Sequence, residues 1–140
     1  MNDNLCLIDT DILSYILKKK QNVYDYAYNY FQKHKNFTIS CITYYECLRG
    51  YKAVNALKRL DVFHELMNVT SILYLDQIIL EKSGDIYSCF KQKGKLPGEF
   101  DIIIGATAIS KNLTLITNNQ KHYRPMEEHF GLKLDNWNRE

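Results

Sequence analysis

The sequence predicts an α/β protein whose central, mainly parallel sheet is covered by helices on both faces. Short apolar runs alternate with longer amphipathic stretches along the 140 residues, and strands separated by helices pair in parallel through crossover connections. The runs at residues 5–8 and 113–117 lack polar alternation, which is typical of strands buried on both faces. No repeat, linker or low-complexity tract divides the chain, so we expect one domain over residues 1–140.

The same pattern sets the expected order of strands and helices. Strands are expected at residues 5–8, 37–40, 69–75, 113–117 and 132–134. Helices are expected at residues 11–20, 22–35, 44–51, 54–67, 76–91 and 99–111. Residues 93–98 contain two glycines and a proline and indicate a loop, whereas residues 118–120 indicate a turn.

Three helices carry more specific expectations. Thr10 is expected to cap the first helix. Tyrosines alternate along residues 22–35 as in a strand, but the length of this segment and its lack of glycine and proline favour a helix. The helix at residues 54–67 is expected to bury the face formed by Val54, Leu57, Leu60, Phe63 and Met67.

Composition excludes several classes of protein. Hydrophobic residues make up 46% and charged residues 24% of the chain, which excludes wholesale disorder. No apolar run reaches the ~20 residues that a membrane span needs, and residues 1–8 have neither the charge order nor the length of a signal peptide. The four cysteines form no CxxC pair and are expected to be small buried side chains in a reducing compartment. We therefore expect a cytoplasmic protein without a membrane partner, while the net charge of +2 neither indicates nor excludes nucleic acid.

Acidic and amide side chains follow the apolar strands. Asp9 comes directly after residues 5–8 and is expected at the edge of the sheet, because burying an unpaired charge is costly. Asp101 lies in the first turn of a helix and precedes a nearly continuous apolar run, and Asn119 follows the strand at 113–117. Simpler interpretations stay open, since acids also cap helices or favour the positive end of the helix dipole, and Asn-Asn is a common turn.

Glu46 has two interpretations from the residues alone. The spacing of Thr43 and Glu46 matches a capping box at a helix start. The neighbouring tyrosines, Cys47 and Leu48 instead indicate a partly buried acid that needs a partner.

The combined positions of these side chains predict a metal site. In parallel sheets ligands bind at the carboxyl ends of the strands, and Asp9, Glu46 and Asp101 at one edge would repel one another unless a cation joined them. Oxygen ligands without His or Cys suit Mg²⁺ or Mn²⁺. Such an ion polarises phosphate oxygens and lowers the pKa of a bound water, so the residues predict hydrolysis of a phosphodiester.

With these residues in place, the chain resembles the PIN-domain nucleases, and within them the VapC-type toxins of bacterial toxin–antitoxin pairs. The matching segments occur in the family's order and cover nearly the whole chain. They are residues 7–13 (LIDTDIL), 44–50 (YYECLRG), 101–108 (DIIIGATA), 113–119 (LTLITNN) and 132–137 (LKLDNW).

This resemblance implies a three-layer α/β/α fold and an endoribonuclease that uses Mg²⁺, with Mn²⁺ able to substitute, and that inhibits translation. It implies an RNA substrate, with tRNA among the family's substrates, a homodimer, and a cognate antitoxin protein that inserts a segment into the active-site groove. By position in the motifs, Asp9 and Asp101 are the main metal ligands and Glu46 completes an acidic triad. Asn119 stands where many relatives carry a fourth acid, so the resemblance leaves the number of metal ions open.

Substrate contacts are expected at Thr10, Arg49, Lys95 and Thr117. Arg49 follows Glu46 by three positions and Lys95 lies shortly before Asp101, where both could hold RNA phosphates. A solvated loop is the alternative for Lys95.

Two other functions stay open at this point. A haloacid dehalogenase-like phosphatase would use Asp9 as nucleophile and Asp11 as acid/base, although the chain offers no paired acid at residues 101–103. The second is a catalytically silent PIN-like binding module, and the presence of Asp9, Glu46 and Asp101 argues against it.

Overall fold

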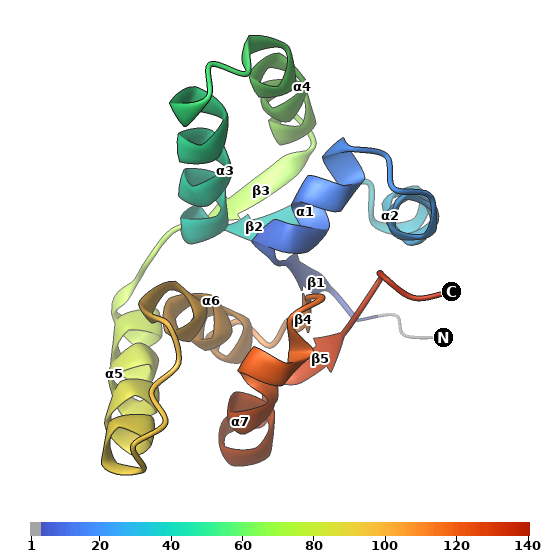
Figure 1. The fold of residues 1–140 in the computed structure, drawn as a ribbon. Coiled ribbons are helices and arrows are strands. Elements are labelled where there is room, and N and C mark those ends of the chain that lie inside the picture. The colour runs from blue at the N-terminus through green and yellow to red at the C-terminus, as the bar shows by residue number, and fades with distance from the viewer. Residues whose placement is uncertain (1–3) are drawn as a thin grey trace.

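A parallel sheet lies between two sets of helices in the computed structural model, which describes residues 4–140 (Figure 1). Its strands are β1 (Cys6–Ile8), β2 (Phe37–Ser40), β3 (Thr70–Leu73), β4 (Thr114–Ile116) and β5 (Lys133–Asp135). β4 pairs with β1 and with β5, β2 pairs with β3, and every one of these pairings is parallel. The hydrogen-bonded strands form two groups, β1-β4-β5 and β2-β3. β1 packs beside β2, so the spatial order across both groups is β3-β2-β1-β4-β5. The predicted α/β class and mainly parallel sheet are confirmed.

Helices connect the strands and cover both faces of the sheet. They are α1 (Thr10–Leu17), α2 (Gln21–His34), α3 (Cys41–Ala53), α4 (Leu57–Met67), α5 (Gln77–Gln92), α6 (Glu99–Ser110) and α7 (Gln120–Phe130). In Figure 1, α1 to α4 lie on one side of the sheet and α5 to α7 on the other.

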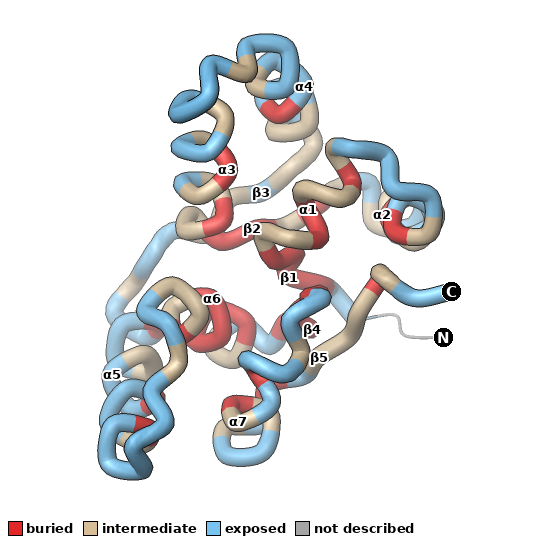
Figure 2. Tube along the Cα trace, in the orientation of Figure 1, coloured by how far each residue is buried: buried red, intermediate tan, exposed pale blue. Residues whose placement is uncertain are grey.

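Alternation along β1 separates two apolar cores. Cys6 and Ile8 point into a core that includes residues of α1, α2, α3 and α4, whereas Leu7 points into a core built with α5, α6 and α7. Successive side chains of a strand point to opposite faces, so a strand buried on both faces must be apolar throughout. The buried segments follow the central strands and the inner sides of the helices (Figure 2). The sheet therefore forms the middle of three layers.

Several local expectations need correction. The first helix begins at Thr10, and its cap is Asp9, whose side chain accepts a hydrogen bond from the Thr10 backbone N–H. The third helix begins at Cys41, because the Ser40 side chain accepts from the Ile42 N–H and caps it. Thr43 and Glu46 consequently lie inside α3, and the capping-box interpretation is wrong.

The expected helix at residues 54–67 is shorter and less buried than its pattern indicates. It begins at Leu57. Val54 is 73% and Leu57 69% exposed, and Phe63 is the fully buried residue of α4. By contrast, the ambiguous segment at residues 22–35 is helical, with Val23 and Ala27 toward the core.

The helix α7 was not expected from the sequence. Pro125 lies inside it, and proline lacks the N–H that continues a helical ladder. Its position is fixed by packing against α6, where a Cβ atom on Gly105 would collide with Met126 Sδ. The close approach of α6 and α7 therefore requires a residue without a side chain at Gly105.

Two further expectations concern the burial of the cysteines and the absence of a membrane span. Burial raises the pKa of the Cys6 and Cys47 thiols to about 12, so both stay protonated, and Cys41 and Cys89 are only partly buried. No helix within residues 4–140 is long and apolar enough to span a membrane. The first three residues of the segment assessed as a signal peptide lie outside the described part of the chain.

Candidate active site

Asp9 directly follows the carboxyl end of β1, the strand that lies between β2 and β4. Its backbone N–H donates to Ile116 O at 2.9 Å, which extends the pairing of β1 with β4 by one residue. This pairing brings Thr117 beside Asp9, and the Thr117 hydroxyl donates to Asp9 Oδ2 at 2.7 Å. Asp9 Oδ1 accepts from the Thr10 N–H at 2.8 Å. Parallel topology thus fixes the carboxylate at the strand end, as the sequence predicts.

The Asp9 carboxylate is unfavourably placed as an anion. Its residue is only 5% exposed. Burial raises the pKa of Asp9 from its ordinary value of 3.8 to about 7, and the charges of Asp11 and Asp101 add to this effect. The hydrogen bonds from Thr117 and Thr10 lower the pKa but do not offset burial. A cation beside Asp9 would relieve both the burial cost and the repulsion.

Asp11 forms the second carboxylate on this side of the site. Its Oδ1 accepts from the Ile12 N–H at 2.7 Å and its Oδ2 from the Asn118 N–H at 3.0 Å. Burial raises the pKa of Asp11, while the backbone hydrogen bonds act in the opposite direction. These bonds tie the turn after β4 to the start of α1.

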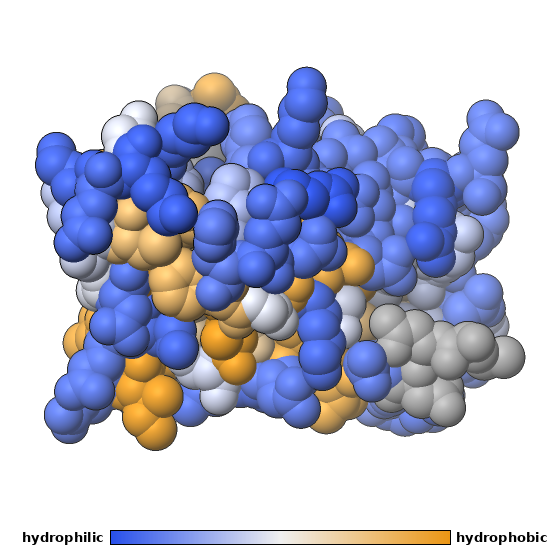
Figure 3. All heavy atoms as spheres, turned by 90° about the horizontal axis from the view of Figure 1, so that it is seen from below, coloured by the Kyte–Doolittle hydropathy of each residue, from blue (hydrophilic) through white to orange (hydrophobic). Residues whose placement is uncertain are grey.

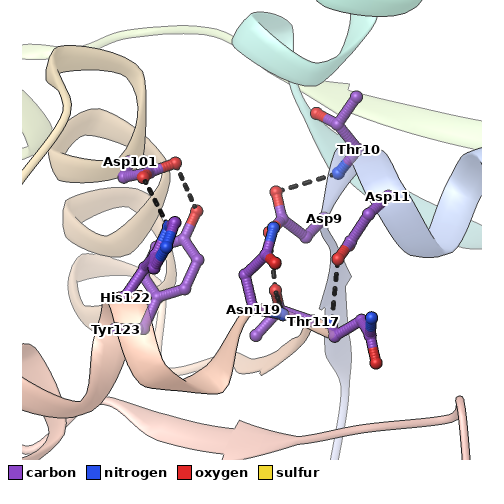
Figure 4. A network of polar contacts seen from close by, with 9 residues as sticks. Asp9, Thr10, Asp11, Asp101, Thr117, Asn119, His122 and Tyr123 are labelled. Carbon is purple, nitrogen blue, oxygen red and sulfur yellow. Dashed lines mark hydrogen bonds and ion pairs between the residues drawn. The ribbon is translucent and has the colours of Figure 1, made fainter.

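Asp101 faces this pair from the first turn of α6 (Figure 4). The buried Tyr123 hydroxyl donates to Asp101 Oδ1 at 3.1 Å, and His122 Nδ1 lies 3.9 Å from Oδ2. Burial and the nearby charges of Asp9 and Asp101 raise the pKa of Tyr123 far above its usual range, so this hydroxyl remains a proton donor. The first turn of α7 therefore orients the Asp101 carboxylate.

Glu46 joins the site through Thr10. The Thr10 hydroxyl lies 2.8 Å from Glu46 Oε1 and 3.1 Å from the Thr43 hydroxyl. Thr10 follows Asp9 directly. Its hydrogen bond to Glu46 therefore holds this acid of α3 close to the end of β1. Within residues 4–140, no group of three or more His, Cys, Asp or Glu side chains is close enough to hold a metal ion by itself. The structure thus places Asp9 and Asp101 across from each other, with Glu46 beside Thr10.

Asn119 lies next to Asp9 at the start of α7 (Figure 4). Its backbone N–H donates to the Thr117 hydroxyl at 3.0 Å, so Thr117 links Asn119 to Asp9. The Asn119 side chain makes no capping bond and is exposed, which leaves its amide oxygen available at the site.

The two expected basic substrate contacts lie in different surroundings. The Arg49 guanidinium lies between two rings, 5.1 Å from the centroid of Tyr45 and 5.2 Å from that of Phe100. It therefore bridges α3 and α6 on the surface. Lys95 lines an open pocket that also includes Asp101 and His122.

Tyr123 and His122 were missed by the reasoning from sequence. Both lie on α7, and no helix was expected there. Asp11 was expected to act only in the phosphatase alternative and was not included among the site residues of the nuclease, because the strand-end pattern points to Asp9 alone.

Comparison with known proteins agrees with this geometry. The model of the PIN domain matches residues 6–127. The chain belongs to the PIN domain family. This match covers β1 and β4, which Asp9 and Thr117 directly follow, and the helix that holds Asp101, and it gives no support to the haloacid dehalogenase-like alternative.

Individual PIN-domain relatives cover most of this chain. It is 34% identical over 128 residues to ribonuclease VapC1 of Methanocaldococcus jannaschii, covering 91% of this chain and 85% of that protein. The structure of VapBC2 from Rickettsia felis bound to a promoter DNA fragment is 25% identical, with a TM-score of 0.78 over 96% of this chain and 99% of that one. A toxin–antitoxin complex from Klebsiella pneumoniae is 28% identical, with a TM-score of 0.61 over 84% of this chain and 89% of that one. The resemblance to VapC-type PIN domains is confirmed.

The donors of this PIN-domain site suit a hard divalent cation. They are carboxylate, hydroxyl and amide oxygens, with no thiolate and only one imidazole, that of His122, near Asp101. Mg²⁺ is commonly held by one or two carboxylates while it keeps several waters. The carboxylates of Asp9 and Asp101 face each other, and burial raises the pKa of Asp9. These two carboxylates therefore fit such an ion, which needs no direct contact with a third acidic side chain.

Proposed function

We propose that the chain is a metal-dependent endoribonuclease that hydrolyses RNA phosphodiester bonds and acts as the toxin of a toxin–antitoxin pair, inhibiting translation. The observation that carries the proposal is the placement of Asp9 and Asp101 across from each other at the carboxyl edge of the sheet, in a member of the PIN domain family. Residues 1–140 would act as a single nuclease domain.

The cofactor would be Mg²⁺, with Mn²⁺ able to substitute. Asp9 and Asp101 would hold it. Glu46, which is hydrogen-bonded to Thr10, would add negative charge beside the ion, and Asn119 would offer a neutral oxygen. When bound, a divalent cation neutralises phosphate oxygens and lowers the pKa of a bound water. The chain's own residues orient these ligands: Thr117 and Thr10 fix Asp9, and Tyr123 fixes Asp101.

The substrate would be RNA, with tRNA as the class to test first. Thr10 and Thr117 lie in contact with acids of the site, Lys95 lies in the pocket beside Asp101, and Arg49 lies on the α3–α6 surface. Cations around an acidic centre hold the flanking phosphates of the cleaved strand.

Two protein partners belong to the same proposal. We expect a cognate antitoxin, since the relatives compared include a VapBC complex and a toxin–antitoxin complex, and a homodimer. Apolar side chains reach the surface among hydrophilic ones on the side of α5 (Figure 3). Ile78 is 64% and Leu80 52% exposed on that helix, which leaves two large apolar side chains accessible to a partner there.

A cleavage assay tests the proposed activity. Purified protein is incubated with total tRNA in Mg²⁺, in Mn²⁺ and in excess chelator, and the 5′ ends of the fragments are sequenced. We expect cleavage at defined positions with either metal and none with chelator. Asp101→Asn should abolish it, whereas the matched control Asp85→Asn, an exposed acid of α5 outside the site, should not. Metal-independent cleavage, or equal activity of both variants, would contradict the assignment.

A further inference from the structure

A groove leads away from the active site on the side of Glu46. One pocket is lined by Thr10 and Glu46 at one end and by Lys18, Tyr51 and Arg59 farther along. A second pocket shares Lys18, Tyr51 and Arg59 and continues to Lys58. Because the two share three lining residues, they form one continuous depression across α1, α3 and the start of α4. We call this depression the basic groove.

The cations of the basic groove have no acidic partner within residues 4–140. Lys18, Lys58 and Arg59 are all exposed. In this described part of the chain, none of the three takes part in an ion pair. The acids of the site stand at the opposite end, with Glu46 bound to Thr10. The groove therefore carries three positive charges that begin next to the catalytic centre.

Two of these cations are unfavourably placed for the fold itself. The first turn of α4 holds Lys58 and Arg59 but no acidic residue, and the preceding Ala56 provides no side-chain cap. The N-terminus of a helix carries partial positive charge, so cations there are destabilising. Their positions do not serve the stability of α4, which indicates that their charge acts on something outside the chain.

We propose that the basic groove binds the phosphates of a single-stranded RNA segment that continues from the scissile bond past Glu46. This inference rests on the proposed ribonuclease function and deepens it. A row of cations without base-reading partners suits the repeated charge of a nucleic-acid backbone. Continuity with Thr10 and Glu46 favours the strand being cut over an acidic protein segment. The groove would thus strengthen RNA binding without selecting its sequence.

Binding in the absence of metal tests the groove separately from cleavage. The affinity of a fluorescent oligouridylate is measured in chelator at several salt concentrations, for the wild type and for the triple variant Lys18→Gln, Lys58→Gln, Arg59→Gln. Each phosphate contact with single-stranded nucleic acid contributes about 0.7 to the slope of log affinity against log salt. Loss of three contacts should make the slope shallower by about 2.

A matched variant controls for the change in net charge. This triple variant removes the same charge from α5 and β5, away from the groove, by the substitutions Lys82→Gln, Lys91→Gln and Lys133→Gln. This control should retain the wild-type slope. Circular dichroism and thermal melting should show the groove variant to be folded and at least as stable as the wild type, because it removes cations from the start of α4.

Kinetics provide the second measurement. In the groove variant, KM for a long RNA should rise by more than kcat falls, and the rise should disappear with RNA truncated on the side of the cut that enters the groove. Equal salt slopes for the wild type and the groove variant, or equal effects of the groove and control variants, overturn the inference. So does an unchanged RNA affinity combined with weaker binding of an acidic peptide such as polyglutamate. If the wild type binds RNA with the expected slope but cleaves none, the proposed function fails while the groove assignment stands.

Discussion

Replacing Asp9 by asparagine should inactivate the protein and, at the same time, stabilise its metal-free form above neutral pH. Asp9 is buried, and its pKa rises from 3.8 to about 7 on folding. The folded state therefore holds more protons than the unfolded state between these values, and stability falls as pH rises through this window. An asparagine side chain at this position would carry no charge, so the variant would escape this loss.

The magnitude follows from the size of the pKa change. A rise from 3.8 to about 7 corresponds to about 4 kcal/mol of unfolding free energy lost by the wild type at pH 8. The single acceptor oxygen of asparagine can still accept from the Thr10 N–H, but its NH2 group cannot accept from the Thr117 hydroxyl, and loss of that hydrogen bond costs about 1 kcal/mol. We expect a net gain of about 3 kcal/mol at pH 8 and of about 1 kcal/mol or less at pH 5, where the carboxyl of the unfolded chain is already ionised and about 2 kcal/mol of the loss has occurred.

Urea denaturation in chelator at the two pH values measures the effect. The exposed control Asp85→Asn should change the free energy of unfolding by less than about 0.5 kcal/mol at either pH. Addition of Mg²⁺ at pH 8 should stabilise the wild type and leave Asp9→Asn unaffected, because the variant lacks the ligand charge. RNA cleavage is measured on the same preparations.

Two results would refute this reasoning. If Asp9→Asn is no more stable than the wild type at pH 8 in chelator, burial and repulsion do not destabilise the carboxylate as the structure indicates. If the variant cleaves RNA at the wild-type rate in Mg²⁺, Asp9 is not a ligand, whatever its effect on stability.

Three further substitutions test the rest of the site. Glu46→Gln should lose activity at an unchanged melting temperature, because the Gln carbonyl can still accept from the Thr10 hydroxyl; retained activity would leave Glu46 a structural partner only. Tyr123→Phe should cost about 1 kcal/mol of unfolding free energy and lower kcat more than it changes KM, since Asp101 loses the hydroxyl that orients it; unchanged kinetics would separate Tyr123 from catalysis. Asn119→Asp should raise the Mn²⁺ affinity measured by calorimetry, because it adds charge beside Asp9; equal affinities of two folded proteins would leave Asn119 a turn residue.

The parts predicted correctly from sequence depend on strand periodicity and parallel topology. Residues 5–8 and 113–117 are apolar without alternation, and parallel pairing then brings Asp9 and Thr117 to the same edge. The expected position of Asp101 at a helix start is confirmed for the same kind of local reason, since Gly98 and Pro97 end the preceding loop and α6 begins at Glu99.

The parts that sequence could not supply depend on packing between distant segments. The helix α7 is stabilised by contact of Met126 and Tyr123 with Gly105, which overrides the local effect of Pro125. The role of Tyr123 follows from that contact, so a prediction without α7 could not include it. The capping-box interpretation of Glu46 failed for the opposite reason, because a local motif was outcompeted by a cap three residues earlier, at Ser40.

The buried acid at Asp9 can persist because the surrounding fold does not depend on its charge. The sheet register around it is held by backbone bonds, from Asp9 N–H to Ile116 O and from Thr117 N–H to Asp135 O. The two apolar cores lie on opposite faces of the same strands and make no use of the carboxylate. The metal-free protein therefore carries a local instability at the strand end that its packing holds in place. Binding of a cation at this position would offset the cost of burying the carboxylate. Metal binding would then be coupled to stability at the residue that we propose as a metal ligand.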